Sequence, residues 1–141
     1  MEFTPKLKEE IIDKLEQILE SIKIIKERCK DYHTLDDFFQ SPWGMTVMEA
    51  CIMRLQVIGE TIKGIDEKTH QTLLSEYPQV PWRKIIGLRN IISHEYANID
   101  YDIIWVVIER YLSPLQETVE TVRQDFLKYV LPLSPKQKHC M

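Results

Sequence analysis

The strongest constraint on the fold is a set of apolar residues near the N-terminus. They recur at spacings of four, four, three, four, three and four: Leu7, Ile11, Leu15, Ile18, Ile22, Ile25 and Cys29. This period matches one face of an α-helix and forms the narrow seam that two packed antiparallel helices share. With Thr4 as N-cap and Pro5 at the first helical position, it predicts a helix from Pro5 to about Lys30.

A second long helix is predicted after a polar break. Thr34 is expected to cap a short turn in which Phe38 and Phe39 plug the end of a bundle. The long helix should start at 41–42 and end near 64–66, where a glycine and an aspartate interrupt the pattern. Its apolar positions again follow the helical period: Met48, Cys51, Leu55, Ile58, Ile62 and Ile65.

The C-terminal half contains two more long helical patterns, preceded by a short one. Residues 68–77 predict a short helix closed at Tyr77, because the residue before a proline avoids helical geometry. The next helix opens at residues 80–82 and is expected to run to about Ala97. Asp100 is a plausible N-cap for the last helix, from Tyr101 to about Val130. Pro114 inside that helix should kink or split it.

Composition supports an all-α fold. Four glycines and seven prolines in 141 residues are too few turn signals for an all-β protein. Long helices with short connections predict an antiparallel bundle of four long helices plus short ones. We expect one domain over residues 1–130 and a flexible C-terminal tail over 131–141.

The cysteines and the N-terminus predict a cytoplasmic protein. Cys29, Cys51 and Cys140 form no CxxC pair and have no neighbouring histidine at metal-ligand spacing. An odd cysteine count and the lack of a signal-peptide pattern fit a reducing cytosol, with Cys29 and Cys51 as core residues. The longest apolar run, residues 103–108, is far shorter than the ~20 residues that cross a membrane. We therefore expect no membrane, no bound metal and no cofactor.

The stretch "GLRNIISHEY", residues 87–96, places several polar groups on one apolar helical pattern. The core side of that helix is assigned to Ile85, Ile86, Leu88, Ile91 and Ile92. At about 100° per residue, Asn90 and His94 share one face, while Arg89, Ser93 and Tyr96 form an adjacent column. Arg89 and His94 then diverge by about 140°. Either the helix loosens before His94, or a second copy of the chain completes the site.

These residue types suit chemistry on a phosphate. Histidine can accept or donate a proton at neutral pH. Arginine offers a planar, permanently charged fork to phosphate oxygens and to the charge of a transition state. RNA supplies its own nucleophile, the 2′-OH, so a positioned base could act without a metal. Spacing alone also allows a structural interpretation, in which Arg89 pairs with Glu95 or Glu60 and His94 caps the bundle.

The motif and its flanks resemble the HepT-like toxins of the HEPN superfamily. "RNIISHEY" fits the R-x-x-x-x-H-x-Y motif, and "RLQVIGETIK", "VPWRKIIGLRNIISHEY" and "IDYDIIW" resemble that family's core. The resemblance covers roughly residues 6–130. It implies a dimeric, metal-independent ribonuclease, the toxin of a type VII-like toxin–antitoxin pair. The usual antitoxin is a minimal nucleotidyltransferase, which transfers AMP from ATP to the motif tyrosine.

Carried over to this sequence, the resemblance makes Arg89 and His94 the catalytic pair, supported by Asn90, and Tyr96 the modified residue. Glu60 matches the family and could orient a cation of the site, although an exposed helix-end carboxylate explains it as well. Supporting roles are also conceivable for three further residues: Arg54, Arg83 and Ser93. For Arg54 a salt bridge is the favoured explanation. Trp82 and Trp105 are expected to be core or dimer-interface aromatics.

Two other functions remain open. A helical adaptor that binds a nucleotidyltransferase without any hydrolytic activity would keep the bundle and the partner surface. A nucleotide-binding module would need a phosphate cradle, and the sequence has no glycine-rich loop. A net charge of −4 disfavours a broad phosphate-gripping surface, so RNA is expected at one site and DNA is not expected. The identity of the RNA target cannot be inferred from the sequence.

Overall fold

The structure, a computed structural model, describes residues 3–94 and 96–130, apart from the side chains of 91–94, 96, 129 and 130. All elements in this part of the chain are helical. In order they are α1 (Pro5–Cys29), α2 (Leu35–Phe38), α3 (Pro42–Lys68), η1 (Leu74–Glu76), α4 (Trp82–His94), η2 (Tyr96–Asn98), α5 (Tyr101–Val106), η3 (Val107–Tyr111) and α6 (Leu112–Val130). The predicted all-α bundle is therefore confirmed.

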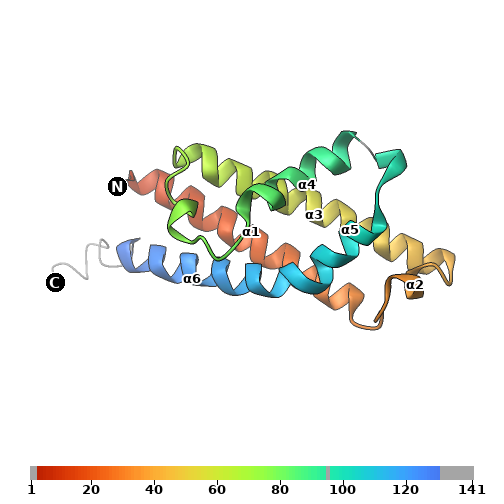
Figure 1. The fold of residues 1–141 in the computed structure, drawn as a ribbon. Helices are drawn as coiled ribbons and strands as arrows, with labels where there is room; N and C mark the ends of the chain where they lie inside the picture. The colour runs from red at the N-terminus through yellow and green to blue at the C-terminus, as the bar shows by residue number, and fades with distance from the viewer. Residues whose placement is uncertain (1–2, 95, 131–141) are drawn as a thin grey trace.

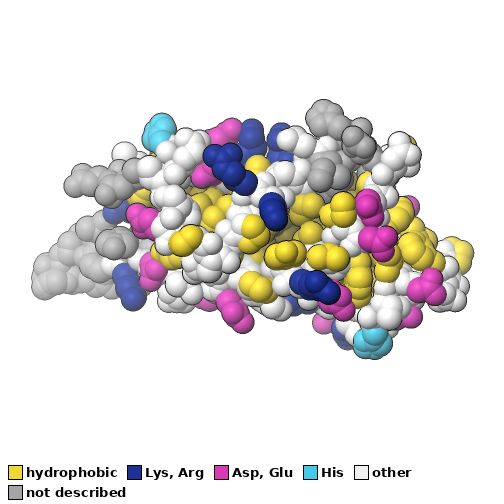
Figure 2. Space-filling model, in the orientation of Figure 1, with side chains coloured by type: hydrophobic (Ala, Val, Ile, Leu, Met, Phe, Trp, Pro, Cys, Tyr) yellow, Lys and Arg dark blue, Asp and Glu magenta, His cyan; other side chains and the backbone are white. Residues whose placement is uncertain are grey.

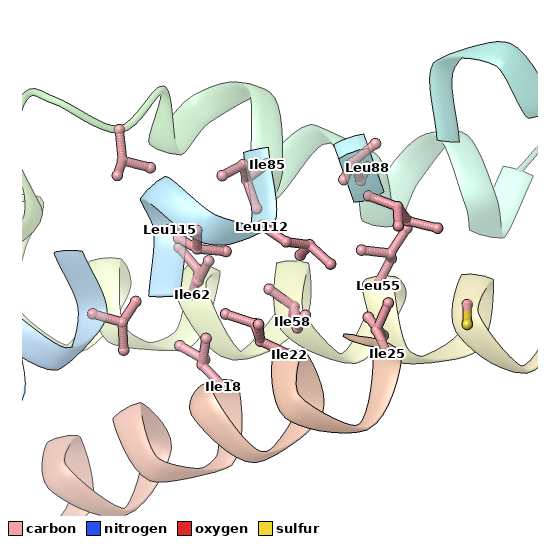
Figure 3. Packing of buried hydrophobic residues seen from close by; sticks show 14 of the residues in the cluster. Ile18, Ile22, Ile25, Leu55, Ile58, Ile62, Ile85, Leu88, Leu112 and Leu115 are labelled. Atoms are coloured by element: carbon pink, nitrogen blue, oxygen red, sulfur yellow. The ribbon is translucent and has the colours of Figure 1, made fainter. Parts of the chain in front are cut away.

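The long helices alternate in direction. α1 lies between α3 and α6, and α4 packs on the other side of α3 (Figure 1). Side chains from all four helices meet in one core, where Ile85 and Leu88 of α4 point toward α3 (Figure 3). Every member of the predicted α1 seam from Ile11 to Cys29 is buried. The seam thus packs as its periodicity predicts.

The predicted helix starts are confirmed by their hydrogen bonds. The backbone N–H of Leu7 donates to Thr4 Oγ1 at 3.1 Å, and that of Gly44 donates to Ser41 Oγ at 3.0 Å. Thr34 forms a complete capping box with α2. Asp100 accepts from the N–H groups of residues 102 and 103. Each cap satisfies amides that have no partner within the helix.

The helix ends were less accurately predicted. α3 runs to Lys68, not to residues 64–66, because Gly64 keeps a negative φ and stays inside the helix. The left-handed conformation typical of a glycine after a helix is instead adopted by His70 (φ 54°) and Gln71 (φ 61°). The short helix predicted over residues 68–77 is only the 3₁₀ turn η1, which ends before Tyr77 as expected.

The last helix is distorted where Pro114 predicts it. α5, η3 and α6 follow one another without a break, but η3 is a π-helical turn. Pro114 lies three residues beyond that turn and cannot donate to the carbonyl of Arg110, since it has no N–H. The predicted kink is therefore realised as a change of helix type.

The aromatic plug at the bundle end is half confirmed. Phe38 is fully buried, stacks on Tyr32 with ring centroids 4.2 Å apart, and meets Trp105 edge-on at 5.5 Å. Phe39 is 44% exposed and only touches the ring of Tyr101, so its assignment to the plug is wrong. Phe38 is the last residue of α2 and Phe39 is its C-cap, and at this end of the bundle only Phe38 faces the core.

The sulfur atoms of Cys29 and Cys51 lie 3.5 Å apart in the core as free thiols. Their assignment as core residues is confirmed. Residues 131–141, expected to form a flexible tail, lie outside the described residues. Within the described ranges, no helix is both long and apolar enough to cross a membrane.

Candidate active site on α4

α4 buries one side against α3 and leaves a polar side at the surface. Ile85 and Leu88 are buried and Ile86 is half-buried, as the assigned core side predicts. The side chains of Ile91 and Ile92, assigned to the same side, lie outside the description. The helix is therefore held by its apolar positions, and the described polar side chains of α4, such as Arg89 and Asn90, are not part of the core.

Arg89 is half-buried beside the exposed Asn90. Its Nη1 donates to Asn90 Oδ1 at 3.0 Å. It makes no ion pair with Glu60 or with any other carboxylate of the described residues, and Glu95 is not described. A guanidinium has five N–H donors, so this contact leaves donors available for a phosphate.

An ion pair on α3, which the sequence analysis did not identify, lies close enough to Arg89 for their charges to interact. Lys63 and Glu67 of α3 form an ion pair at 2.9 Å. The hydrogen bond and charge of Lys63, and more weakly the charge of Arg89, lower the pKa of the Glu67 carboxyl. Glu67 follows Glu60 by seven residues, about two helical turns, so it lies on nearly the same face of α3. That spacing was the available sequence signal.

His94 is the last residue of α4, and the helix stays α-helical up to it. Loosening of the helix before His94, one of two predicted ways to unite it with Arg89, is therefore not found. The helix expected to reach Ala97 ends three residues earlier, because the chain must turn before Asp100 caps α5. Tyr96 consequently belongs to η2 and does not continue the helical column of Arg89. The side chains of Ser93, His94 and Tyr96 lie outside the description.

The other candidate residues lie on α3 and α4 and differ in their exposure to solvent. Arg83 is exposed at the start of α4, Glu60 is exposed on α3, and Arg54 is half-buried on α3. Among the described residues, neither Arg54 nor Glu60 forms an ion pair, so the predicted salt bridge of Arg54 is not found. Trp82 is half-buried and donates from Nε1 to the Tyr77 carbonyl at 2.8 Å, as expected for a packing aromatic.

An apolar groove of about 500 Å³ runs between α4 and the α5–η3 segment. Its lining comprises Pro81, Lys84, Ile85, Gly87, Leu88, Asp102, Ile103, Val106, Val107 and Tyr111. Ile103, Val106 and Tyr111 are 45%, 37% and 38% exposed, which is unusual for such large apolar side chains. Apolar side chains gather on this face between charged ones (Figure 2). The groove adjoins the helix that carries Arg89.

The described residues do not bring three or more His, Cys, Asp or Glu side chains together in a way that could hold a metal ion. The four glycines of the chain are isolated and form no phosphate-binding loop. Of the polar candidate residues in the motif, Arg89 and Asn90 are the two whose side chains the structure describes.

Comparison with known proteins gives one family. The family described as "Ribonuclease HepT-like" matches residues 18–122. A protein named "Putative RNase" from Caldanaerobacter subterraneus subsp. tengcongensis is 30% identical, over 78% of this chain and 91% of its own length. One named "Probable ribonuclease HepT" from Thermococcus cleftensis is 27% identical, over 79% and 94%.

A longer relative shares the same region. A protein of Methanocaldococcus jannaschii named "Gamma-glutamylcyclotransferase and putative RNase" is 32% identical over 81% of this chain, which spans only 48% of that protein. No solved structure matches the chain. The family match covers well over half of the residues, including α3, α4 and the whole R-x-x-x-x-H-x-Y motif. The chain belongs to the HepT-like ribonuclease family.

Proposed function

We propose that this chain is a metal-independent endoribonuclease and the toxin of a type VII-like toxin–antitoxin pair. The observation that carries the proposal is Arg89, a half-buried residue whose guanidinium donates to Asn90 in an exposed hydrogen bond and pairs with no carboxylate of the described residues. It lies five residues before His94 on one uninterrupted helix. Family membership supplies RNA as the substrate class.

The chemistry follows from the roles of these two side chains. His94 takes the proton of an RNA 2′-OH, whose oxygen attacks the adjacent phosphorus in line. The bond from phosphorus to the 5′-oxygen breaks, and that oxygen leaves with a proton from the solvent or from a second histidine. The products are a 2′,3′-cyclic phosphate and a 5′-hydroxyl. Arg89 stabilises the extra negative charge of the pentacoordinate transition state, with Asn90 holding its orientation.

A two-fold dimer completes the site in this proposal. A rotation of about 140° separates positions 89 and 94 on a continuous helix, so one copy cannot easily aim both residues at one phosphate. The groove beside α4 carries one cation, Lys84, and one anion, Asp102. In a two-fold interface, when one residue of the first copy contacts a different residue of the second, the reverse contact forms as well. Lys84 of each copy can therefore pair with Asp102 of the other. The groove is therefore the surface we assign to the second copy.

The proposed regulation is AMP transfer to Tyr96 by a minimal nucleotidyltransferase. The phenol oxygen attacks the α-phosphorus of ATP, pyrophosphate leaves, and the phenol proton passes to the solvent. Tyr96 follows His94 by two residues, so the added phosphodiester would bring bulk and negative charge next to the catalytic groups. Arg89 could then bind that phosphate in place of RNA.

Cleavage is tested with a single-stranded RNA in excess EDTA. We expect a 2′,3′-cyclic phosphate product, abolished by His94→Ala and nearly abolished by Arg89→Ala. Arg28→Ala, which removes an exposed arginine of α1, is the matched control and should cleave normally. Activity that needs Mg²⁺, or that survives both substitutions, would exclude this mechanism.

Assembly is tested by light scattering at micromolar concentration. We expect a dimer, and we expect Val106→Arg in the groove to give an inactive monomer. Val57→Arg is the control, because Val57 is equally exposed (36%) but lies on α3 outside the groove lining. A fully active wild-type monomer would exclude a shared site.

Regulation is tested by co-expression with the cognate nucleotidyltransferase, followed by mass spectrometry. We expect one or more AMP groups and loss of cleavage. Tyr96→Phe should stay unmodified and active, while Tyr111→Phe, at an exposed tyrosine of η3, should be modified and silenced as the wild type is. Inhibition of an unmodified wild-type chain would mean that the antitoxin acts by binding. A chain that binds the nucleotidyltransferase but never cleaves RNA would support the adaptor function.

A further inference from the structure

Gly59, in the middle of α3, lies directly beneath the turn of α4 that carries Arg89. A Cβ atom at this position would lie 3.0 Å from the Ile85 carbonyl oxygen and 3.5 Å from both the N and the Cβ of Arg89. Gly59 is buried, and Ile85 and Leu88 anchor the same part of α4 in the core (Figure 3). At this point α3 therefore meets the turn of α4 through a residue without a side chain.

The atoms that Gly59 faces are the backbone of α4 and the first carbon of the Arg89 side chain, so they cannot rotate away as the end of a flexible side chain could. In an α-helix the N–H of residue 89 donates to the carbonyl of residue 85, so Gly59 bears on both ends of one helical hydrogen bond. A Cβ contact of 3.0 Å with a backbone atom is tighter than nine in ten real Cβ contacts. An added methyl group would have to push the turn of α4 outward by a few tenths of an ångström, together with the base of the Arg89 side chain.

Gly64, a second glycine of α3, gives a matched comparison. A Cβ at Gly64 would meet only the flexible end of Lys14, at 3.6 Å or more. Glycine is a poor helix former, so both positions disfavour α3 locally. Of these two positions, only Gly59 is explained by the close approach of a neighbouring backbone; Gly44, near the start of α3, also faces a backbone, that of Phe38, far from Arg89 in the sequence.

We propose that Gly59 is a positioning residue that sets the depth of α4 on α3 and thereby places Arg89 in the active site. The inference rests on the proposed function only through the role of Arg89. Gly59 touches no substrate in this scheme. Its effect reaches the reaction through the backbone of residues 85–89.

The test compares Gly59→Ala with Gly64→Ala in the full chain. A misplacement of 1 Å can cost about 10²-fold in rate, so a shift of a few tenths of an ångström should lower kcat for RNA cleavage about tenfold. KM should change by less than about twofold, because Arg89 acts mainly on charge that develops in the transition state. Gly64→Ala should keep the wild-type kcat and melt at a slightly higher temperature.

A readout without catalysis separates this inference from the proposed function. In ¹H–¹⁵N NMR spectra, Gly59→Ala should shift the Arg89 amide resonance strongly, and Gly64→Ala should leave it in place. If the wild type does not cleave RNA, the proposed function fails while this resonance still tests the position of Arg89. If the wild type cleaves and Gly59→Ala leaves both kcat and the resonance unchanged, the positioning role is excluded.

A rate lowered by unfolding of the variant must be distinguished from a rate lowered by displacement of Arg89. Rates are compared well below the melting temperature of each variant. If Gly59→Ala does not fold, Ile85→Val tests the same turn by thinning the layer beneath it, since Ile85 is buried at 5% exposure. A lowered kcat with a shifted Arg89 resonance supports the inference, and an unchanged kcat overturns it.

Discussion

The α1 seam and the polar side of α4 are built from the same secondary structure but respond to different constraints. The seam places an apolar residue at every third or fourth position, and its residues from Ile11 onward are buried. The polar side of α4 carries Arg89 and Asn90, whose described hydrogen bond is to each other. Burial of the seam stabilises the fold, whereas Arg89 and Asn90 add little to it and remain available to a ligand. Stability and function are thus assigned to different sides of the helices.

The largest effect on stability is expected from Phe38→Ala at the bundle end. Phe38 is fully buried between Tyr32 and Trp105, so truncation should lower the free energy of unfolding by about 3–5 kcal/mol. Phe39→Ala, at the neighbouring 44% exposed position, is the control and should cost much less. Chemical denaturation measures both, and equal losses would mean that burial does not separate the two regions as described.

Arg89→Ala should have a much smaller effect on stability. The side chain is half-buried and its described hydrogen bond goes to an exposed neighbour, so the free energy of unfolding should change by less than about 0.5 kcal/mol. The same variant should nearly abolish RNA cleavage. Loss of folding in this variant would contradict the division between a stabilising core and a functional helix side.

The smallest expected effect is on the titration of Glu67. Its pKa is lowered chiefly by Lys63 and less by Arg89. Carbon-detected NMR titration should therefore find the pKa of Glu67 raised most by Lys63→Gln and less by Arg89→Ala. Because the folded-state pKa is depressed, any stability from this carboxylate is present above its unfolded-state pKa and is lost as the pH falls through the folded-state value. If Arg89→Ala leaves the pKa of Glu67 unchanged, the Arg89 guanidinium does not lie close to this part of α3.

Much of the fold could be predicted because its signals are local. Thr4, Ser41 and Asp100 cap helices through hydrogen bonds to residues two or three positions along the chain. Helix ends were harder to predict: Gly64 stays inside α3, and the left-handed residues after it are His70 and Gln71. A glycine within a helix resembles a terminator in the sequence, and only its packing neighbours distinguish the two.

The residues of the candidate site could be named from the sequence, but their geometry could not be predicted from it. The motif names Arg89, Asn90 and His94, and their order on one helix follows from the helical period. The Lys63–Glu67 pair near Arg89 was not anticipated, nor was the end of α4 at His94. Both depend on how α4 lies on α3 and on where the chain must turn toward α5.

The sequence by itself determined which residues form the helices, which side of each is apolar, and which family the motif resembles. The helices and their apolar sides follow from the helical period and from capping, which act between residues a few positions apart; the family resemblance rests on the motif residues and their flanks. Only the tertiary structure decided that Gly59 lies beneath Arg89, at a distance where a single methyl group would displace the helix. Such contacts join residues some thirty positions apart. Close packing of two backbones fixes them, and no local pattern in the sequence records that depth.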